Sequence, residues 1–201
     1  MKIVNEIKKV LSPYKYEGDM TVLGNLEAGT ELEVKNGSLV INGNIENGAR
    51  IHLNLTQELI DITYMVNDKE NEPKIGFKLE VKGSIGDFVS IDSDADIEAN
   101  VIGKRCRIKS EYGAITAKSI GFETEVNVCN AIEVTDTAEF VVLSSKQKGL
   151  KAANLGAIVT VHVQGEIEVG AIGLKSKLTS EQKGLKAKNV GHHVVIQTKK
   201  Q

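Results

Sequence analysis

Histidines are the side chains in this sequence best suited to bind a metal ion or to act as a general base. There are four of them: His52, His162, His192 and His193. A zinc centre needs three or four ligands that converge on one ion. His192 and His193 fall in different columns of the repeat described below, and the repeat equivalent of His162 is Gln197. We therefore expect no metal site and no cofactor.

Two cysteines and one acidic run are the remaining candidates for chemistry. Cys106 aligns with apolar positions of the repeat, so it should point inward as a small apolar side chain. Cys129 lies near a predicted corner, where we expect an ordinary thiol rather than a reactive one. The alternating run Asp92–Glu98 offers the oxygen ligands that calcium prefers, but it lacks the GGxGxD repeat of calcium-binding solenoids. We interpret it as solvated strand and corner residues, and we predict no catalytic residues.

Charge and composition exclude several classes of protein. The 201 residues include 25 Lys and Arg against 27 Asp and Glu, a formal net charge of −2. This balance lacks the basic footprint of a nucleic-acid-binding protein, so no nucleic acid partner is expected. Two cysteines point to a reducing compartment, and we expect a cytoplasmic location. Hydrophobic residues make up 41% of the chain, yet aromatic residues make up only 4% and Trp is absent.

A 35-residue repeat dominates the second half of the sequence. Ser145–Gly156 (SKQKGLKAANLG) and Ser180–Gly191 (SEQKGLKAKNVG) are identical at nine of twelve positions. Within each unit, apolar anchors follow gaps of 6, 6, 5, 6, 7 and 5 residues, which make one coil of 17 and one coil of 18 residues. The anchors are Ile85, Ile91, Ile97, Ile102, Ile108, Ile115, Ile120, Val126, Ile132, Thr137, Leu143, Leu150, Leu155, Val161, Ile167, Ile172, Leu178, Leu185, Val190 and Ile196.

These gaps predict an all-β solenoid, or β-helix, with three short strands in each coil and a triangular cross-section. A helix would not hold such gaps on one face. Each anchor should point inward together with the residue two positions away, as in Val126 and Val128, because side chains alternate along a strand. A narrow bore filled by Ile, Leu and Val explains the scarcity of aromatic residues, since a larger side chain would overpack it.

The rhythm divides the chain into five segments. They are residues 1–19 (an N-terminal cap or short helix), 20–53 (the first coils), 54–76 (an insertion), 77–197 (the regular β-helix) and 198–201 (a tail). Both prolines lie outside the regular coils, as a sheet requires. Glycines recur at the corners, where their tolerance of positive φ would suit a tight turn.

The N-terminal segment has several interpretations. Its apolar residues at positions 3, 7, 10 and 11 have helical spacing, and Pro13 ends the segment. A packing cap or an edge strand is the simplest interpretation. An amphipathic helix that associates with a membrane surface is the less favoured alternative.

Outward-facing columns of the repeat also carry information. One column reads Glu133, Lys151, Glu168, Lys186, so charges alternate in sign between neighbouring coils, which favours this register. A corner column and its neighbour hold apolar residues that we predict as lateral contacts. They are Phe88, Phe122, Phe140 and Ile158.

The repeat motifs resemble two kinds of family. The I-G-x-x-x-x-I pattern, as in IGDFVSI and IGKRCRI, resembles the hexapeptide repeats of left-handed β-helix acyltransferases. The I-x-A-x-x-[IV] frame (ITAKSI, LKAANL, LKAKNV) with V-x-G-x-I (VQGEI) is more similar to bactofilins, the polymer-forming bacterial cytoskeletal proteins. The stretch LEAGTELEVKNGSLVINGNIENGARI resembles the β-helix of the FapA-like (DUF342) family. This similarity covers residues 20–53 and 80–197, and it implies a right-handed, three-sided β-helix that serves as a scaffold or polymer without an active site.

We therefore expect a non-enzymatic scaffold that forms homo-oligomers through the ends of the β-helix. Little sequence remains to cover the last coil, so the predicted self-association site is its apolar surface: Val190, Val194 and Ile196. The N-terminal segment would block the other end and give dimers in place of filaments. Two alternatives stay open, namely an enzyme of the hexapeptide acyltransferase type that uses His162, and a solenoid that binds another protein or a carbohydrate.

Overall fold

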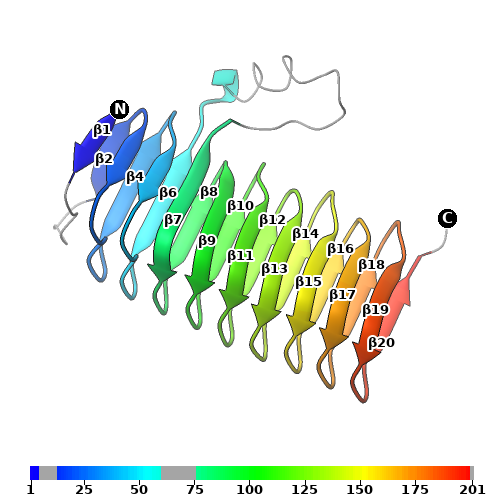
Figure 1. The fold of residues 1–201 in the computed structure, drawn as a ribbon. Coiled ribbons are helices and arrows are strands. Elements are labelled where there is room, and N and C mark those ends of the chain that lie inside the picture. The colour runs from blue at the N-terminus through cyan, green and yellow to red at the C-terminus, as the bar shows by residue number, and fades with distance from the viewer. Residues whose placement is uncertain (5–12, 60–75, 200–201) are drawn as a thin grey trace.

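The structure, a computed structural model, describes residues 1–4, 13–59 and 76–199. Twenty strands follow one another along the chain (Figure 1). They are β1 (Lys2–Val4), β2 (Tyr14–Glu17), β3 (Met20–Val22), β4 (Glu31–Lys35), β5 (Leu39–Ile41), β6 (Arg50–Asn54), β7 (Lys78–Ile85), β8 (Ser90–Ser93), β9 (Asp96–Ile102), β10 (Arg107–Ser110), β11 (Ile115–Ile120), β12 (Glu125–Val128), β13 (Ile132–Thr137), β14 (Val142–Ser145), β15 (Leu150–Leu155), β16 (Thr160–Val163), β17 (Ile167–Ile172), β18 (Lys177–Ser180), β19 (Leu185–Val190) and β20 (Val195–Thr198).

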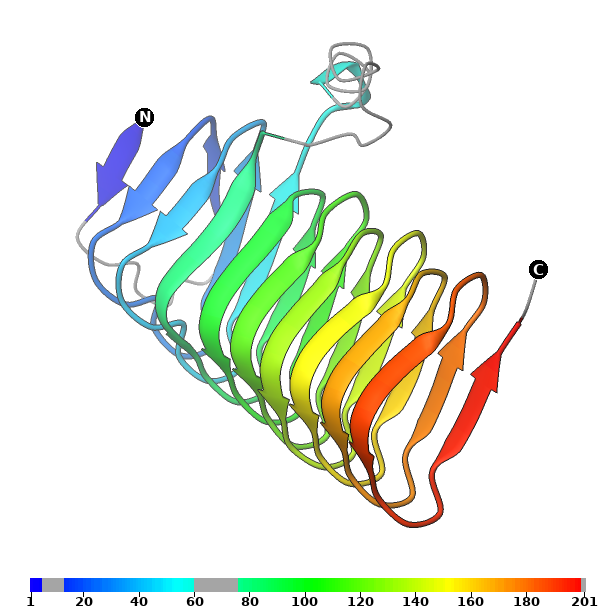
Figure 2. The ribbon, with the colours of Figure 1, turned by 45° about the vertical axis from the view of Figure 1, so that its right-hand side comes forward.

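The strands form two parallel sheets that enclose a common bore. The odd-numbered strands make one ten-stranded sheet, and the even-numbered strands make the other. Ile115 pairs with Ile97 in the coil before it and with Ile132 in the coil after it, so equivalent residues are 18 and then 17 positions apart. Figure 2 shows the coils stacked in one row from the N-terminal to the C-terminal end. The predicted all-β solenoid, with its coils of 17 and 18 residues, is confirmed.

Two of the three short strands predicted for each coil form one continuous strand in the structure. Strand β11 contains two anchors, Ile115 and Ile120, and both are buried. In the ladder between β11 and β13, Ala117 and Ser119 each have a partner residue in β13, but Lys118 has none. The strand bends at Lys118 and continues along the next side of the coil. In the first coils the third side is reduced to isolated bridges that join Leu26 to Ile45 and Ile45 to Ile85. Each regular coil therefore has two strands, one of them bent, around three rows of anchors.

Aliphatic side chains fill the bore from end to end. One cluster of buried apolar residues runs from Met20 in β3 to Leu178 in β18. The weakest anchor, Thr137, is buried as well, and its Oγ1 accepts a hydrogen bond from the Gly156 backbone N–H at 3.0 Å. Val134 and Ala152 pair with each other in a buried column of smaller side chains. No aromatic ring is among the largest fully buried side chains of the described residues.

The insertion leaves the solenoid between β6 and β7. The stack nevertheless continues across it, because Leu39 of β5 pairs with Leu79 of β7, 40 residues later. Leu55, at the start of the insertion, packs against Phe77 and Tyr112 in a small cluster of its own. Residues 60–75, which include most of the predicted loop, lie outside the described part of the chain.

The role predicted for the repeat glycines is wrong in one respect. The backbone of the regular corners does take positive φ, but at non-glycine residues: Phe88, Arg105, Glu123, Phe140, Ile158, Lys175 and His193. Among the described glycines, φ is positive only at positions 18, 29 and 48, in the first coils. At Gly103, a Cβ atom would lie 2.5 Å from the carbonyl oxygen of Gly86 in the preceding coil. The regular glycines are therefore needed because backbones of stacked coils approach closely, not because the turn is left-handed.

A buried serine closes the longer corner of the coils from β10 onward. Ser110, Ser145 and Ser180 occupy equivalent positions at the ends of β10, β14 and β18, and each hydroxyl bonds to backbone carbonyls. The strands between them end in Val128 and Val163, which are also buried. The 35-residue period thus corresponds to an alternation of serine-closed and valine-closed corners.

Candidate functional site

The C-terminal coil leaves the bore of the solenoid open. Strand β19 pairs only with β17, and β20 pairs only with β18, so both are edge strands. Val190 is 51% exposed and Ile196 is 41% exposed, whereas the residues stacked beneath them, Ile172 and Leu178, are 3% and 0% exposed. Val194 is half-buried and packs against the core. The three residues predicted for self-association therefore surround one apolar end face.

The N-terminal end is built differently. Lys2 pairs with Met20 and so takes the inward-facing column that apolar residues hold in the following coils. Its Nζ lies 4.7 Å from the ring centroid of Tyr14 and 5.1 Å from that of Tyr16, a cation–π arrangement over the end of the bore. Of the predicted cap or helix, residues 1–19, residues 2–4 form an edge strand and residues 14–17 form β2, which pairs with β4. Residues 5–12 lie outside the described chain.

Charges beside the open end are partly paired within the chain. Lys186 Nζ lies 2.8 Å from Glu166 Oε1, and this hydrogen bond raises the lysine pKa. Lys199 pairs with Glu181, and this hydrogen bond is the main reason why the pKa of Glu181 is lowered. Even so, residues 175–201 contain seven lysines and one acidic residue, so the end face has a basic surround.

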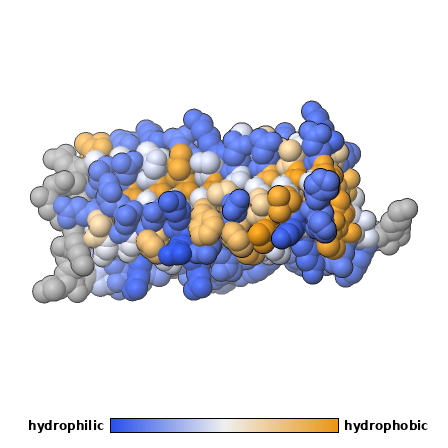
Figure 3. All heavy atoms as spheres, turned by 90° about the horizontal axis from the view of Figure 1, so that it is seen from below, coloured by the Kyte–Doolittle hydropathy of each residue, from blue (hydrophilic) through white to orange (hydrophobic). Residues whose placement is uncertain are grey.

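A second surface runs along one corner of the solenoid. We define the corner ridge as the apolar residues that project there from successive coils: Phe122, Phe140, Val142, Ile158 and Leu174. The rings of Phe122 and Phe140 meet edge to face with centroids 5.3 Å apart. Figure 3 shows apolar atoms gathered along this side of the molecule.

Two residues change the set that the sequence predicted for lateral contacts. Phe88 lies two coils before Phe122 and is separated from it by Arg105, whose guanidinium carbon is 5.8 Å from the Phe88 ring centroid. Val142 was missed. Its signal was available, because it is the only apolar residue between Arg107 and Lys177 in an outward-facing column of β10 to β18.

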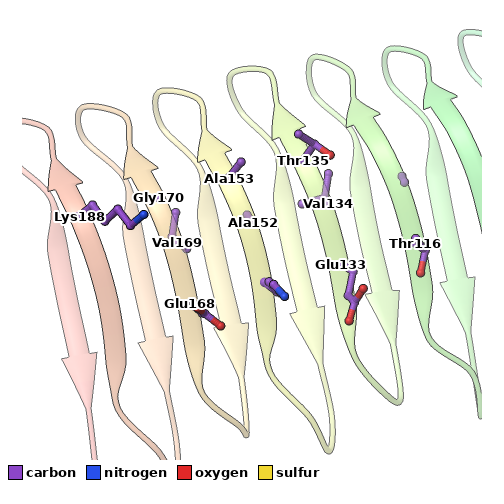
Figure 4. A pocket seen from close by; sticks show the side chains of 12 residues that line it. Thr116, Glu133, Val134, Thr135, Ala152, Ala153, Glu168, Val169, Gly170 and Lys188 are labelled. Atoms are coloured by element: carbon purple, nitrogen blue, oxygen red, sulfur yellow. The ribbon is translucent and has the colours of Figure 1, made fainter.

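A shallow groove crosses the outer face of the odd-numbered sheet. It has a volume of about 490 Å³ and runs over five coils along the bend of the strands (Figure 4). Its lower wall carries the predicted ladder, in which Glu133 pairs with Lys151 and Lys151 with Glu168. Its other wall is made of Thr135, Ala153, Gly170 and Lys188. The ladder register is confirmed.

The histidines and acidic residues do not converge on a common centre. His192 and His193 are exposed at the last corner, and His162 Nδ1 lies 4.0 Å from Glu181 Oε1, directly after the end of the neighbouring strand β18. Asp94 accepts a hydrogen bond from the Leu55 backbone N–H at 2.9 Å, and Asp96 accepts one from Ala114 at 2.8 Å. These carboxylates therefore link the backbones of neighbouring coils. Over residues 1–4, 13–59 and 76–199, no group of three or more His, Cys, Asp or Glu is placed to hold a metal ion.

Both thiols are buried and poorly suited to nucleophilic chemistry. Cys106 points inward, as predicted, with its Sγ 3.1 Å from the carbonyl oxygen of Gly86. Burial raises its pKa, and burial raises the pKa of Cys129 as well. Reactive cysteines have lowered pKa values, because the thiolate is the nucleophile.

The fold and these surfaces define the class of protein, a parallel β-solenoid built from repeats. Comparison of the chain with protein-family models, with curated proteins and with solved structures finds no match. In the part of the chain that the structure describes, no helix is long and apolar enough to cross a membrane. The function is therefore argued from the two apolar surfaces.

Proposed function

We propose that this protein is a non-enzymatic, bactofilin-like scaffold whose copies associate end to end through the C-terminal coil. The single observation that carries the proposal is the exposure of the bore at that end, at Val190 and Ile196. Burying a side chain of this size contributes about 1.5–3 kcal/mol. The same contact gives hydrogen-bond partners to the free edges of β19 and β20.

The occupant that fits best is the C-terminal end of a second copy. A two-fold axis between two such ends makes one self-complementary interface that closes on itself. The N-terminal end is a poor partner, because Lys2, Tyr14 and Tyr16 place a cation and two hydroxyl-bearing rings over the bore. End-to-end association therefore stops at a dimer and does not extend into a filament.

The basic surround of the end face gives this dimer a characteristic salt dependence. Two such ends bring like charges together, since residues 175–201 carry seven lysines and one acidic residue. Added salt screens that repulsion while it leaves the apolar contact in place. The end-to-end dimer should therefore become tighter as ionic strength rises.

Sedimentation velocity of two matched variants tests the proposal. Ile196→Lys places a charge in the bore of the last coil, and we expect it to abolish the end-to-end contact. Gln197→Lys adds the same charge to the outward face of the same strand, and we expect it to associate like the wild type. A wild-type protein that stays monomeric, or an Ile196→Lys variant that associates as the wild type does, would overturn the proposal. Contacts between the N-terminal end of one copy and the C-terminal end of another, seen in electron micrographs, would overturn the assignment of the N-terminal end as closed.

A further inference from the structure

The corner ridge places exposed apolar side chains on a left-handed backbone that recurs in every regular corner. Ile158 and Phe140 both have φ of 57°, in the left-handed region. For a β-branched residue this conformation costs about 1–2 kcal/mol, whereas glycine or asparagine adopts it readily. Both side chains remain well exposed, at 37% for Ile158 and 42% for Phe140, so burial within the chain does not compensate for the cost. Arg105, Glu123 and Lys175 share this backbone, so what distinguishes the ridge is its exposed apolar side chains, which suit a contact outside the chain.

Charges of opposite sign flank the ridge at its two ends. Glu123 and Glu125 lie in the coil of Phe122, on the N-terminal side. Lys175 and Lys177 lie in the coil of Leu174, on the C-terminal side. Glu123 and Lys175 occupy the same corner column, and the register of β12, β14, β16 and β18 places Glu125 and Lys177 in another shared column.

We propose that the corner ridge is an interface between two copies of this chain, packed side by side with their solenoids antiparallel. A two-fold axis that lies in the contact plane and runs across the coils reverses their order but keeps each column opposite itself. When the axis passes between the coils of Phe140 and Ile158, Phe140 of one copy faces Ile158 of the other. One coil further out, Phe122 faces Leu174.

The same axis makes the flanking charges complementary. Glu123 of one copy faces Lys175 of the other, Glu125 faces Lys177, and the symmetry forms each pair twice. Lys175 and Lys177 have no ion-pair partner among the described residues, so their charges are available to a second copy. A parallel arrangement would instead place each coil beside its own copy, with glutamates near glutamates and lysines near lysines.

The glutamates also have partners in their own chain, which orient them. Glu123 Oε2 lies 2.6 Å from Arg105 Nε, and Glu125 Oε2 lies 3.7 Å from Arg107 Nε. These are exposed pairs that leave oxygen atoms free to accept a further hydrogen bond from a lysine. The ridge spans four coils, roughly 14 Å at about 4.8 Å per coil, so we expect a weak dimer that forms over a concentration series.

This interface is independent of the end-to-end contact, and the test separates the two. In the Ile196→Lys background, which lacks the end contact, sedimentation should still show a concentration-dependent dimer. Ile158→Asn should then raise the dimer dissociation constant at least about tenfold. The melting temperature of the Ile158→Asn variant should not fall, because asparagine readily adopts the left-handed backbone conformation at this position. Thr135→Asn, in the groove of the odd-numbered sheet, is the matched control and should leave the dimer intact.

Charge reversal tests the antiparallel register. In the Ile196→Lys background, Glu123→Lys/Glu125→Lys and Lys175→Glu/Lys177→Glu should each be monomeric, because each homodimer would face like charges. An equimolar mixture of the two proteins should form a heterodimer, since every facing pair is then opposite in sign. Rising salt should weaken this lateral dimer, whereas it strengthens the end-to-end dimer.

Three outcomes would overturn the proposal. One is an Ile196→Lys protein that is monomeric at all concentrations. Another is a dimer that Ile158→Asn leaves unchanged. The third is a mixture of the charge-reversed proteins that stays monomeric, which would reject the antiparallel register. None of these results bears on the open end. That contact is tested by comparing Ile158→Asn with the double variant Ile158→Asn/Ile196→Lys at low concentration.

Discussion

The hydroxyl of Ser110 connects Gly113, in its own corner, to Ala95 in the preceding coil. Its Oγ accepts a hydrogen bond from the Gly113 backbone N–H at 2.9 Å and donates one to the carbonyl oxygen of Ala95, in the preceding coil, at 2.8 Å. The serine is buried, so no water replaces either bond. Ser145 repeats the arrangement one unit later, where it accepts from the Lys148 N–H at 3.2 Å.

We expect Ser110→Ala to lower the free energy of unfolding by about 1–3 kcal/mol, because it removes the hydrogen-bond partner of the buried Gly113 N–H. The Ala95 carbonyl keeps its hydrogen bond from the Ser93 hydroxyl. Chemical denaturation measures this effect. Ser119→Ala, on the outward side of β11, removes a hydroxyl with no such bonds and serves as the control. Equal midpoints for the two variants would contradict the role of the buried serine.

Gly149 and Gly184 occupy the same position in successive repeats but differ in what lies beside them. A Cβ at Gly149 would lie 2.0 Å from the backbone oxygen of Glu166 in the next coil, whereas a Cβ at Gly184 meets nothing within 4 Å. We expect Gly149→Ala to destabilise the protein by about 1–3 kcal/mol through overpacking. Gly184→Ala should be neutral, or stabilising by up to about 1 kcal/mol, because it restricts the unfolded chain. Thermal melts of the two variants that coincide would reject close approach as the reason for the repeat glycines.

The buried thiols predict a dependence of stability on alkaline pH. Burial raises the pKa of Cys106 in the folded protein above its value in the unfolded chain. Stability is unaffected by the Cys106 thiol below its pKa in the unfolded chain. It is lost as pH rises from there through the pKa in the folded protein, because the unfolded chain releases the proton more easily. We therefore expect the denaturation midpoint to fall above about pH 8.5, the ordinary value for cysteine. The fall should be smaller in Cys106→Val, a substitution that matches Val89 and Val141 in the same column.

Thiol reactivity offers an independent measurement on the same residues. A disulfide reagent should modify native protein at neutral pH more slowly than it modifies protein in denaturant, since both thiols are buried and mainly protonated. A native rate equal to the denatured rate would show that at least one thiol is accessible.

An enzymatic role predicts a result that a scaffold does not. If the resemblance to hexapeptide acyltransferases extended to chemistry, His162 would be the histidine to test, although it is half-exposed on a strand and lies 4.0 Å from Glu181. We expect purified protein to show no acyl-CoA hydrolysis or transfer, and His162→Ala to match the wild type. Activity that disappears in His162→Ala would contradict the non-enzymatic proposal.

Periodicity predicted the fold well because one side-chain preference, apolar inward, repeats in every coil. Gap lengths placed the anchors from Ile85 to Leu178, including the polar Thr137, in the buried rows. What periodicity missed depends on backbone contacts between coils. The bend at Lys118, which joins two predicted strands, and the close approach at Gly103 leave no apolar signature in the sequence.

The two ends of the solenoid were predictable to different degrees. Ile196 follows the repeat rule, so its position at the rim of the bore could be read from the gaps, and it is exposed because β20 pairs with β18 alone among the described strands. The N-terminal coil departs from the rule. Lys2, Tyr14 and Tyr16 match no anchor type, and only their approach in space shows that they close the bore.

The alternation of corners also sets how such a protein can change in length. From β10 to β18, a single coil that is gained or lost would place two serine-closed or two valine-closed corners next to each other and break the alternation. A gain or loss of a whole 35-residue unit leaves every corner with its proper neighbour. Variants that gain or lose repeats should therefore differ in length by steps of roughly 9.6 Å, which is two coils at about 4.8 Å each. Every such variant keeps the same two end faces.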